Sequence, residues 1–294
     1  MIEGGHYRGA CDSQSVLLNC LTIVGRRSHF GHFMLDFLWP LYHWLYMRGR
    51  LYDKDLTVYI KDQNIEAFRS IVNEFFHCKV VTKFTSSEAN GCLRDMILGM
   101  EGHNRRVFKL GVKDYVGRPK EYIRHFQHYT FEKLGIEREK ADKFLLVERK
   151  IVDEDRGGGR RTIENHRELE KGLSVLAEMK GLHFENVMLE DMSFTEQVKL
   201  FAEAQVVVGQ HGAGLCHFLW MPEDAVLQEV HHTDKEAYRF GGFCNFFGRR
   251  HGNMVCPSTE KQNIVVPVNE LMIGLDKTIG EYHEREDDEA EVSS

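Results

Sequence analysis

A turn of glycines around one histidine is the stretch of this chain best suited to chemistry. Gly209, Gly212 and Gly214 follow a run of three valines, and His211 lies between the first two glycines. Glycines between a strand and a helix let backbone N–H groups approach a ligand closely, and the helix N-terminus adds about half a positive charge. This combination predicts a site for a diphosphate, where the His211 ring can donate a hydrogen bond to a phosphate or sugar oxygen.

The spacing of this glycine turn separates it from better-known loops. It is not the Gly-x-Gly-x-x-Gly of dinucleotide-binding proteins, and no Lys-Ser or Lys-Thr follows it as in a Walker loop. The segment His211–Gly214 is similar to the oxyanion loop of lipases, but the chain has no Gly-x-Ser-x-Gly nucleophile elbow. A tight turn that binds no ligand remains the alternative for the motif taken alone.

The elements that must position this turn lie on both sides of it. Val206–Val208 predicts a buried strand, and apolar residues at helical spacing predict a helix from near Ala213 to Pro222. A second strand is predicted at Ala225–Val230, which completes a strand–helix–strand unit. Because ligands bind beyond the carboxyl ends of such strands, Glu229 is placed to accept both ribose hydroxyls of a nucleotide. An exposed charge at the strand end is the alternative interpretation of Glu229.

The sequence around this turn resembles a known family. The segments Ser193–Gln197, Val206–Leu215 and Phe218–Val230 together look like the signature of family 61 glycosyltransferases. Two further patches, at 30–42 and 149–166, agree with it. The resemblance covers roughly residues 28 to 260 and is dense in these three regions.

The patch at 30–42 supplies a candidate general base. A helix is predicted from about His29 after the capping residue Ser28, with a kink or restart at Pro40. His32 and Asp36 are four residues apart and therefore share a face of an α-helix. The resemblance implies that this pair lies on the acceptor side, with Asp36 as the base and His32 as its orienter or as the base itself. An ion pair on the helix surface is the alternative.

The patch at 149–166 supplies candidate phosphate ligands. Arg149 follows a predicted strand at 144–147, and Arg160 and Arg161 close a glycine-rich loop. The patch resembles the family's strand-end arginine followed by Arg-x-x-x-Asn. Guanidinium groups bind phosphate oxygens bidentately, so the three arginines suit a nucleotide diphosphate. A solvated basic loop is the alternative.

The rest of the chain alternates between the two periodicities of regular structure. Further strands are predicted at 16–24, 56–60, 79–84, 96–100, 183–189 and 264–268, and further helices at 64–76, 115–134, 195–204 and 269–282. This alternation indicates an α/β fold with mostly parallel sheets. A polar segment at 135–142 divides it, so we predict an acceptor-side domain at 1–138, a nucleotide-sugar domain at 139–283 and a disordered acidic tail at 284–294.

Composition excludes several classes of partner. The net charge is −7 over 294 residues, and the acidic C-terminal segment carries most of it, so nothing favours nucleic acid or an anionic membrane. Seven cysteines at irregular spacing predict neither a disulfide framework nor a zinc site. The sequence shows no signal peptide or membrane anchor, so we expect no membrane insertion and a cytoplasmic location, unless the chain is trimmed from a secretory-pathway enzyme.

The resemblance implies an architecture and a reaction. The architecture is GT-B, with two facing Rossmann-like doubly wound domains and the active cleft between them. The reaction is an inverting transfer from a nucleotide sugar to a glycan or glycoprotein hydroxyl, with no metal and no cofactor. The donor is UDP-xylose in our first interpretation, because the overall form looks most like virus-encoded β-xylosyltransferases, and UDP-N-acetylglucosamine in our second. The donor ligands are Arg149, Arg160, Arg161, Gly209, His211, Gly212, Ala213, Gly214 and Glu229.

Two readings from other classes remain open. Asp53-Lys-Asp55 and Asp153-Glu-Asp155 have the Asp-x-Asp form of a manganese site, as in a metal-dependent GT-A transferase. A nucleotide-binding module without catalysis is the other reading, which Asp36→Asn would test. Glu101 and Asp114 are alternatives to Asp36 as the general base. The sequence does not set the oligomeric state.

Overall fold

The computed structural model describes residues 15–19, 30–60, 68–81, 95–98, 119–149, 162–233, 240–259 and 263–292. They belong to two compact units, which are described separately. The first unit is Met1–Gly117 with Glu132–Gly135, and the second is Arg118–Phe131 with Ile136–Ser294. In the described part of the chain no helix has the length and apolarity needed to cross a membrane.

The first unit is built on a parallel sheet in the order β3-β2-β1-β4. Within the described residues its strands lie at the predicted places, and α3 (Arg69–Phe75) covers the second half of the helix expected at 64–76. The strands are β1 (Ser15–Asn19), β2 (Thr57–Ile60), β3 (Lys79–Val81) and β4 (Asp95–Leu98). The predicted α/β character of this half therefore holds for the residues described.

The helix expected from about His29 is divided into three parts. It begins as α1 (Phe30–His32), continues as the π-helix η1 (Phe33–Leu38) and restarts as α2 (Trp39–Met47). At the junction the Trp39 N–H bonds to the Met34 carbonyl, five residues back. Pro40 has no N–H for the carbonyl four residues before it and its ring crowds that carbonyl, which favours the wider turn. The predicted restart near Pro40 is confirmed, whereas the regular α-helical spacing is not.

The second unit is built on a five-stranded parallel sheet in the order β6-β5-β7-β8-β9. Four of its strands match the predictions. The strands are β5 (Lys143–Glu148), β6 (His183–Met188), β7 (Ala204–Gln210), β8 (Val226–His231) and β9 (Arg250–Val255). The strand predicted at 264–268 is wrong, because Ile264 makes only isolated bridges, to Ile163 and Ser258. The fifth strand is β9, a polar edge strand whose sequence lacks a strand pattern.

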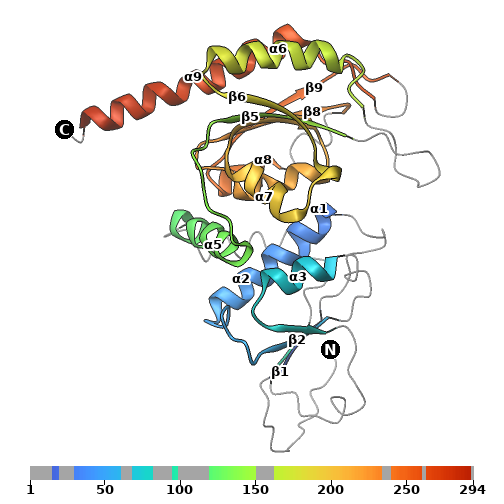
Figure 1. The fold of residues 1–294 in the computed structure, drawn as a ribbon, viewed down its shortest axis with the longest axis vertical. Helices are drawn as coiled ribbons and strands as arrows, with labels where there is room; N and C mark the ends of the chain where they lie inside the picture. Colours follow the sequence, from blue (N-terminus) through green and yellow to red (C-terminus); the bar gives the residue numbers. More distant parts are fainter. Residues whose placement is uncertain are drawn as a thin grey trace, which may run out of the picture. The chain divides into compact units, whose positions relative to one another are not determined.

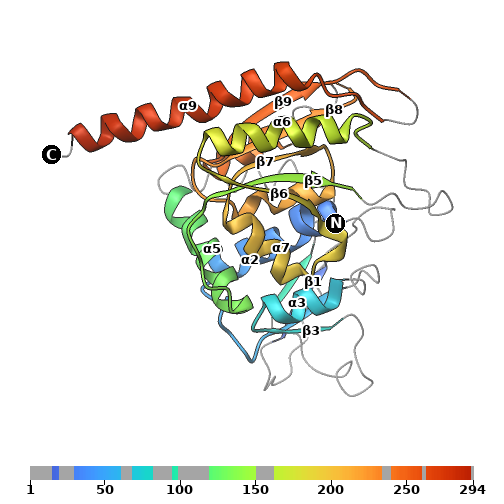
Figure 2. The same cartoon turned by 45° about the horizontal axis from the view of Figure 1, so that its top comes forward.

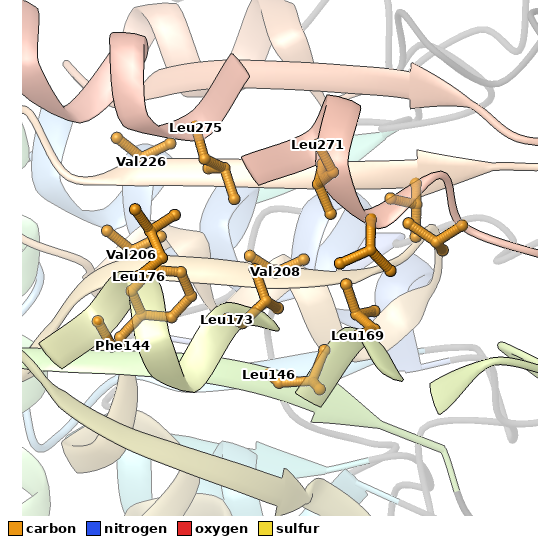
Figure 3. Close-up of a cluster of buried hydrophobic side chains, with 14 of the residues drawn as sticks. Phe144, Leu146, Leu169, Leu173, Leu176, Val206, Val208, Val226, Leu271 and Leu275 are labelled. Atoms are coloured by element: carbon orange, nitrogen blue, oxygen red, sulfur yellow. The ribbon is translucent and has the colours of Figure 1, made fainter. Parts of the chain in front are cut away.

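Helices cover both faces of this second sheet (Figures 1 and 2). On one face lie α6 (His166–Met179) and α9 (Val268–Val292), and on the other lie α7 (Phe194–Ala202) and α8 (Gly241–Phe246). The core between the sheet and the α6–α9 pair is apolar and buried (Figure 3). It includes Phe144, Leu146, Leu169, Leu173, Leu176, Val206, Val208, Val226, Leu271 and Leu275.

Helix α5 (Pro119–Leu134) changes the predicted domain boundary. The prediction placed it in the domain at 1–138, but its residues up to Phe131 belong to the second unit. The buried Gln127 side chain donates hydrogen bonds to the carbonyls of Leu219 (3.2 Å) and Met221 (2.8 Å). The Phe126 ring lies 6.2 Å from that of Trp220. These long-range contacts are invisible to a division based on local composition.

The C-terminal end also differs from the prediction. The tail expected to be disordered from 284 continues α9 as helix as far as Val292. Four of the nine residues from 284 to 292 are glutamate, which is a good helix former, and this gives the extension a local cause.

Candidate functional site

The carboxyl ends of β5 and β7 are where the second sheet is expected to bind a ligand. The chain leaves β5 toward β6 on one side, and β7 lies on the other side, so the strand order reverses between β5 and β7. In open parallel sheets ligands bind outside the carboxyl ends of the strands at such a switch point. Arg149 follows the end of β5, and the glycine turn follows the end of β7.

Arg149 lies directly against the glycine turn. Its Nη2 donates a hydrogen bond to the His211 carbonyl at 3.3 Å. A Cβ added to Gly212 would overlap the Arg149 guanidinium and lie 3.1 Å from its Nε. Gly212 is therefore a glycine because the guanidinium occupies the space of a side chain. The structure thus brings the strand-end arginine and the turn together, and their shared role in donor binding stays a prediction.

The helix after the turn is a 3₁₀-helix, η5 (Ala213–Trp220), where the sequence predicted a helix of no particular type. Gly212 caps it in an extended conformation, and the Leu215 N–H bonds back to the Gly212 carbonyl at 3.2 Å. The first N–H groups of a helix have no partner within it. Ala213 and Gly214 are only half-buried, so the backbone at this end is accessible from solvent.

The other two glycines allow close packing beneath the turn. A Cβ on Gly209 would lie 3.0 Å from Leu215 and 3.3 Å from Val147. A Cβ on Gly214 would lie 2.8 Å from Leu189 Cδ1. The Gln197 side chain holds that neighbour in place, because its Nε2 donates to the Leu189 carbonyl at 2.8 Å. The segment that resembles the family at Ser193–Gln197 thus supports the turn from below.

A buried carboxylate lies behind the turn. Glu229 has no exposed surface, and its Oε1 lies 2.8 Å from His211 Nδ1 while its Oε2 lies 2.6 Å from His251 Nε2. Burial acts to raise the pKa of Glu229, but the hydrogen bonds from the two imidazoles outweigh it and hold the pKa below its usual range. Glu229 is therefore ionised at neutral pH.

The charge of Glu229 fixes the protons of its neighbours. An ionised carboxylate has no hydrogen to donate, so the facing nitrogens, His211 Nδ1 and His251 Nε2, must both carry one. The His211 ring is also held on its faces, 5.3 Å from the His231 ring and 5.0 Å from the Phe240 ring. The result is a rigid imidazole next to Gly212 and Arg149.

The sequence matches the family model of Glycosyltransferase 61 over residues 30–227, which is more than half of the chain. The chain belongs to glycosyltransferase family 61. The protein O-linked-mannose beta-1,4-N-acetylglucosaminyltransferase 2 of Xenopus tropicalis is 31% identical over 110 residues, which are 37% of this chain and 17% of that protein. The EGF domain-specific O-linked N-acetylglucosamine transferase of Gallus gallus is 31% identical over 78 residues, which are 26% of this chain and 14% of that protein. The matches thus span less than a fifth of either relative.

Among solved structures, the E. coli heptosyltransferase WaaC with ADP is similar with a TM-score of 0.43 and 11% sequence identity. The similarity covers 90% of this chain and 100% of that one.

Several predicted site residues of this family 61 chain lie outside what the structure describes. Arg160 and Arg161 are among them, as are Glu101 and Asp114. Asp36 lies in η1, but its side chain is not described, and His32 is exposed at the end of α1. Because η1 is a π-helix, the four-residue spacing no longer gives the α-helical alignment on which the pairing of His32 with Asp36 was based. The assignment of the base stays a prediction.

Glu229 has a different environment from the one expected. It is neither an exposed strand-end charge nor open to solvent, since both oxygens face imidazoles and the residue is fully buried. Its assignment to the ribose hydroxyls stays a prediction. His251 was not singled out as a site residue from the sequence, because β9 was not recognised as a strand beside β8.

One of the two Asp-x-Asp segments in this family 61 chain is described. Asp53 Oδ2 pairs with Arg50 at 2.8 Å, and Oδ1 accepts the N–H groups of Asp55 and Leu56 at 3.0 and 3.1 Å. Both oxygens thus stabilise a turn before β2. The other segment, 153–155, lies outside the described residues. Among the described residues, no three His, Cys, Asp or Glu side chains are grouped so as to hold a metal ion.

Proposed function

We propose that this chain is a glycosyltransferase that moves a sugar from a UDP-sugar to a hydroxyl of an oligosaccharide or glycoprotein. The observation that carries the proposal is the Arg149 guanidinium seated on Gly212 at the switch point of the second sheet. Membership of family 61 supports the reaction class. We further propose the GT-B architecture and inversion at the anomeric carbon.

The donor diphosphate would bind without a metal ion. A leaving diphosphate carries several negative charges that must be stabilised in the transition state. At this site Arg149 supplies a positive charge, and the start of η5 supplies backbone N–H groups on the positive end of a helix dipole. Arg160 and Arg161, which follow β5 in the sequence, would add to that charge. These groups together take the place of a divalent cation.

Two donors are candidates. The form of the sequence favoured UDP-xylose. The relatives from Xenopus tropicalis and Gallus gallus are named as N-acetylglucosamine transferases, which favours UDP-N-acetylglucosamine. Both share the nucleotide and the diphosphate, so the site described above suits either.

The test is UDP release by the purified chain from UDP-xylose and from UDP-N-acetylglucosamine, with a panel of glycan acceptors. Each assay is run in EDTA and in Mn²⁺. We expect one donor to be used at equal rates in both conditions. Activity only with Mn²⁺ would favour an Asp-x-Asp site, and no UDP release from any UDP-sugar would contradict the proposal.

The proposed base is tested with the same assay. Removal of a general base typically lowers a rate by about 100-fold or more, so Asp36→Asn should lose transfer to that extent and keep its affinity for UDP. Asp55→Asn, at an exposed position of the same unit, is the matched control and should keep both. Full transfer by Asp36→Asn would assign the base to another residue.

A further inference from the structure

The candidate site contains a carboxylate that is fully buried. Glu229 is 0% exposed, whereas His211, its partner, keeps 7% of its surface exposed. The His211 carbonyl also accepts the hydrogen bond of Arg149, so backbone and side chain of His211 both belong to the site. A ribose hydroxyl would have to displace an imidazole to contact Glu229.

We propose that Glu229 and His251 are positioning residues of the donor site, which hold His211 so that its ring binds the donor diphosphate, and that Glu229 does not bind the ribose. The inference rests on the proposed function, and it replaces the ribose role expected for Glu229. It adds His251, on a strand that the sequence did not reveal, to the residues on which donor binding depends.

His251, Glu229 and His211 form a continuous series of hydrogen-bonded side chains. His251 Nε2 faces Glu229, and a Cβ on Gly241 would lie 3.1 Å from His251 Nδ1, so α8 packs closely on this ring. One oxygen of Glu229 accepts a hydrogen bond from His251 Nε2, and the other accepts one from His211 Nδ1. The chain of contacts therefore runs from β9 through β8 to the turn after β7.

A hydrogen bond from His211 to a phosphate would need both ring nitrogens of His211 to carry a hydrogen. With a hydrogen on Nδ1 for Glu229, His211 can donate to a phosphate oxygen only through Nε2, and thus only as an imidazolium. A carboxylate on one side and a diphosphate on the other stabilise that cation between two anions. Without Glu229, the ring would lose its Nδ1 hydrogen bond and one of the two anions, and only the packing of His231 and Phe240 would orient it.

The experiment uses two ligands, UDP and 2′,3′-dideoxyuridine diphosphate, which lacks the ribose hydroxyls. Calorimetry gives the Kd of each for the full chain and for Glu229→Gln, His211→Ala and the double variant. Glu203→Gln is the matched control, because Glu203 is a buried carboxylate of the same unit, paired with Lys143 and Lys199 just before the amino end of β7.

We expect Glu229→Gln to weaken both ligands by the same factor, about tenfold or more, as for the loss of a hydrogen bond to a charged group. The double variant should bind no more weakly than His211→Ala, and Glu203→Gln should bind as the wild type does. If Glu229→Gln does not fold, His251→Gln removes the other anchor and should show the same pattern with a smaller factor.

Two results would overturn the inference. In the first, Glu229→Gln weakens UDP but not the dideoxy ligand, which would assign Glu229 to the ribose. In the second, the loss of binding free energy in the double variant equals the sum of the losses in Glu229→Gln and His211→Ala. A wild-type chain that binds neither ligand would instead refute the proposed function. In that case, ¹⁵N spectra of histidine-labelled protein without ligand test whether Glu229 positions His211. His211 signals that are the same in Glu229→Gln as in the wild type would refute this positioning role.

Discussion

At the scale of single residues, the contact between Gly212 and Arg149 makes the sharpest prediction. Gly212 is extended, with φ at 174°, so alanine fits the backbone, but its Cβ would take the space of the guanidinium. Gly212→Ala should therefore displace Arg149 and lower the affinity for UDP by about tenfold or more, with little change in melting temperature. Calorimetry and thermal melts measure both effects.

The control for this substitution is Gly242→Ala. A Cβ on Gly242, in α8 of the same unit, would meet nothing within 4 Å. This variant should keep both its UDP affinity and its stability. Equal losses in the two variants, or a UDP affinity unchanged by Gly212→Ala, would contradict the role given to Arg149.

A second prediction at this scale concerns His217 and the stability of the protein at acidic pH. Complete burial, among the rings of Phe194, Phe201 and Trp220, lowers the pKa of His217 to about 3 from 6.5. Between these values the unfolded chain binds a proton that the folded chain does not, so the free energy of unfolding falls as the pH falls, by up to about 1.4 kcal/mol per pH unit.

This window can be separated from that of Glu229. The lowered pKa of Glu229 contributes stability that is present above its unfolded value of 4.5 and lost as the pH falls through the lower folded value. From pH 6.5 to 4.5, the wild type should thus lose about 2 kcal/mol more than His217→Phe. Denaturant unfolding at several pH values measures the difference, and parallel slopes for the two proteins would disprove it.

Whether a contact in the site could be predicted from the sequence depends on which structural elements bring its residues together. Arg149 and the glycine turn could be brought together in advance, because both follow strands of one parallel sheet. The pairing of His211 with Glu229 could not, since it depends on the β7–β8 register and on the rings of His231 and Phe240 that pack against His211. The pairing of His251 with Glu229 could not be predicted without β9, whose sequence is too polar to be recognised as a strand.

At the scale of elements, the crossing of α6 and α9 is set by a glycine. A Cβ on Gly172 would lie 2.8 Å from both Met272 Sδ and Val268 Cγ1. Gly172→Ala should therefore destabilise the protein by about 1–3 kcal/mol through overpacking, although alanine is the better helix former. Denaturant unfolding measures this change.

Gly274→Ala provides the opposite case on the same helix pair. Gly274 is exposed in α9, and a Cβ there would meet nothing within 4 Å. This variant should stabilise the protein by about 0.5–1 kcal/mol. Stabilisation by both alanines would show that the two helices are not in close contact at Gly172.

Elements whose residues carry a single strong pattern were predictable from the sequence. The apolar strands β5, β7 and β8 are examples, and so is α7, where Ser193 and Glu196 form a reciprocal capping box. The misses have specific physical causes. Pro40 converts part of a predicted α-helix into a π-helix, and Ile264 makes single bridges where its β-branched neighbours suggested a strand.

At the scale of the whole molecule, the division into two α/β units follows from the alternation of strands and helices along the sequence. The boundary does not, because α5 joins the second unit through contacts to residues about 90 positions away, such as the Gln127–Leu219 hydrogen bond. The predicted donor residues that the structure describes all lie in the second unit. We therefore propose that this unit binds the donor diphosphate through Arg149 and the glycine turn.

The measurement that tests this claim most directly is the calorimetric affinity of the full chain for UDP in the presence of EDTA. Arg149→Ala is compared with Arg124→Ala, which removes an exposed arginine of the same unit, ion-paired with Glu223 before β8. We expect the wild type and Arg124→Ala to bind UDP without metal, and Arg149→Ala to lose at least about tenfold in affinity. Binding that requires Mn²⁺, or an Arg149→Ala variant that binds UDP as the wild type does, would contradict it.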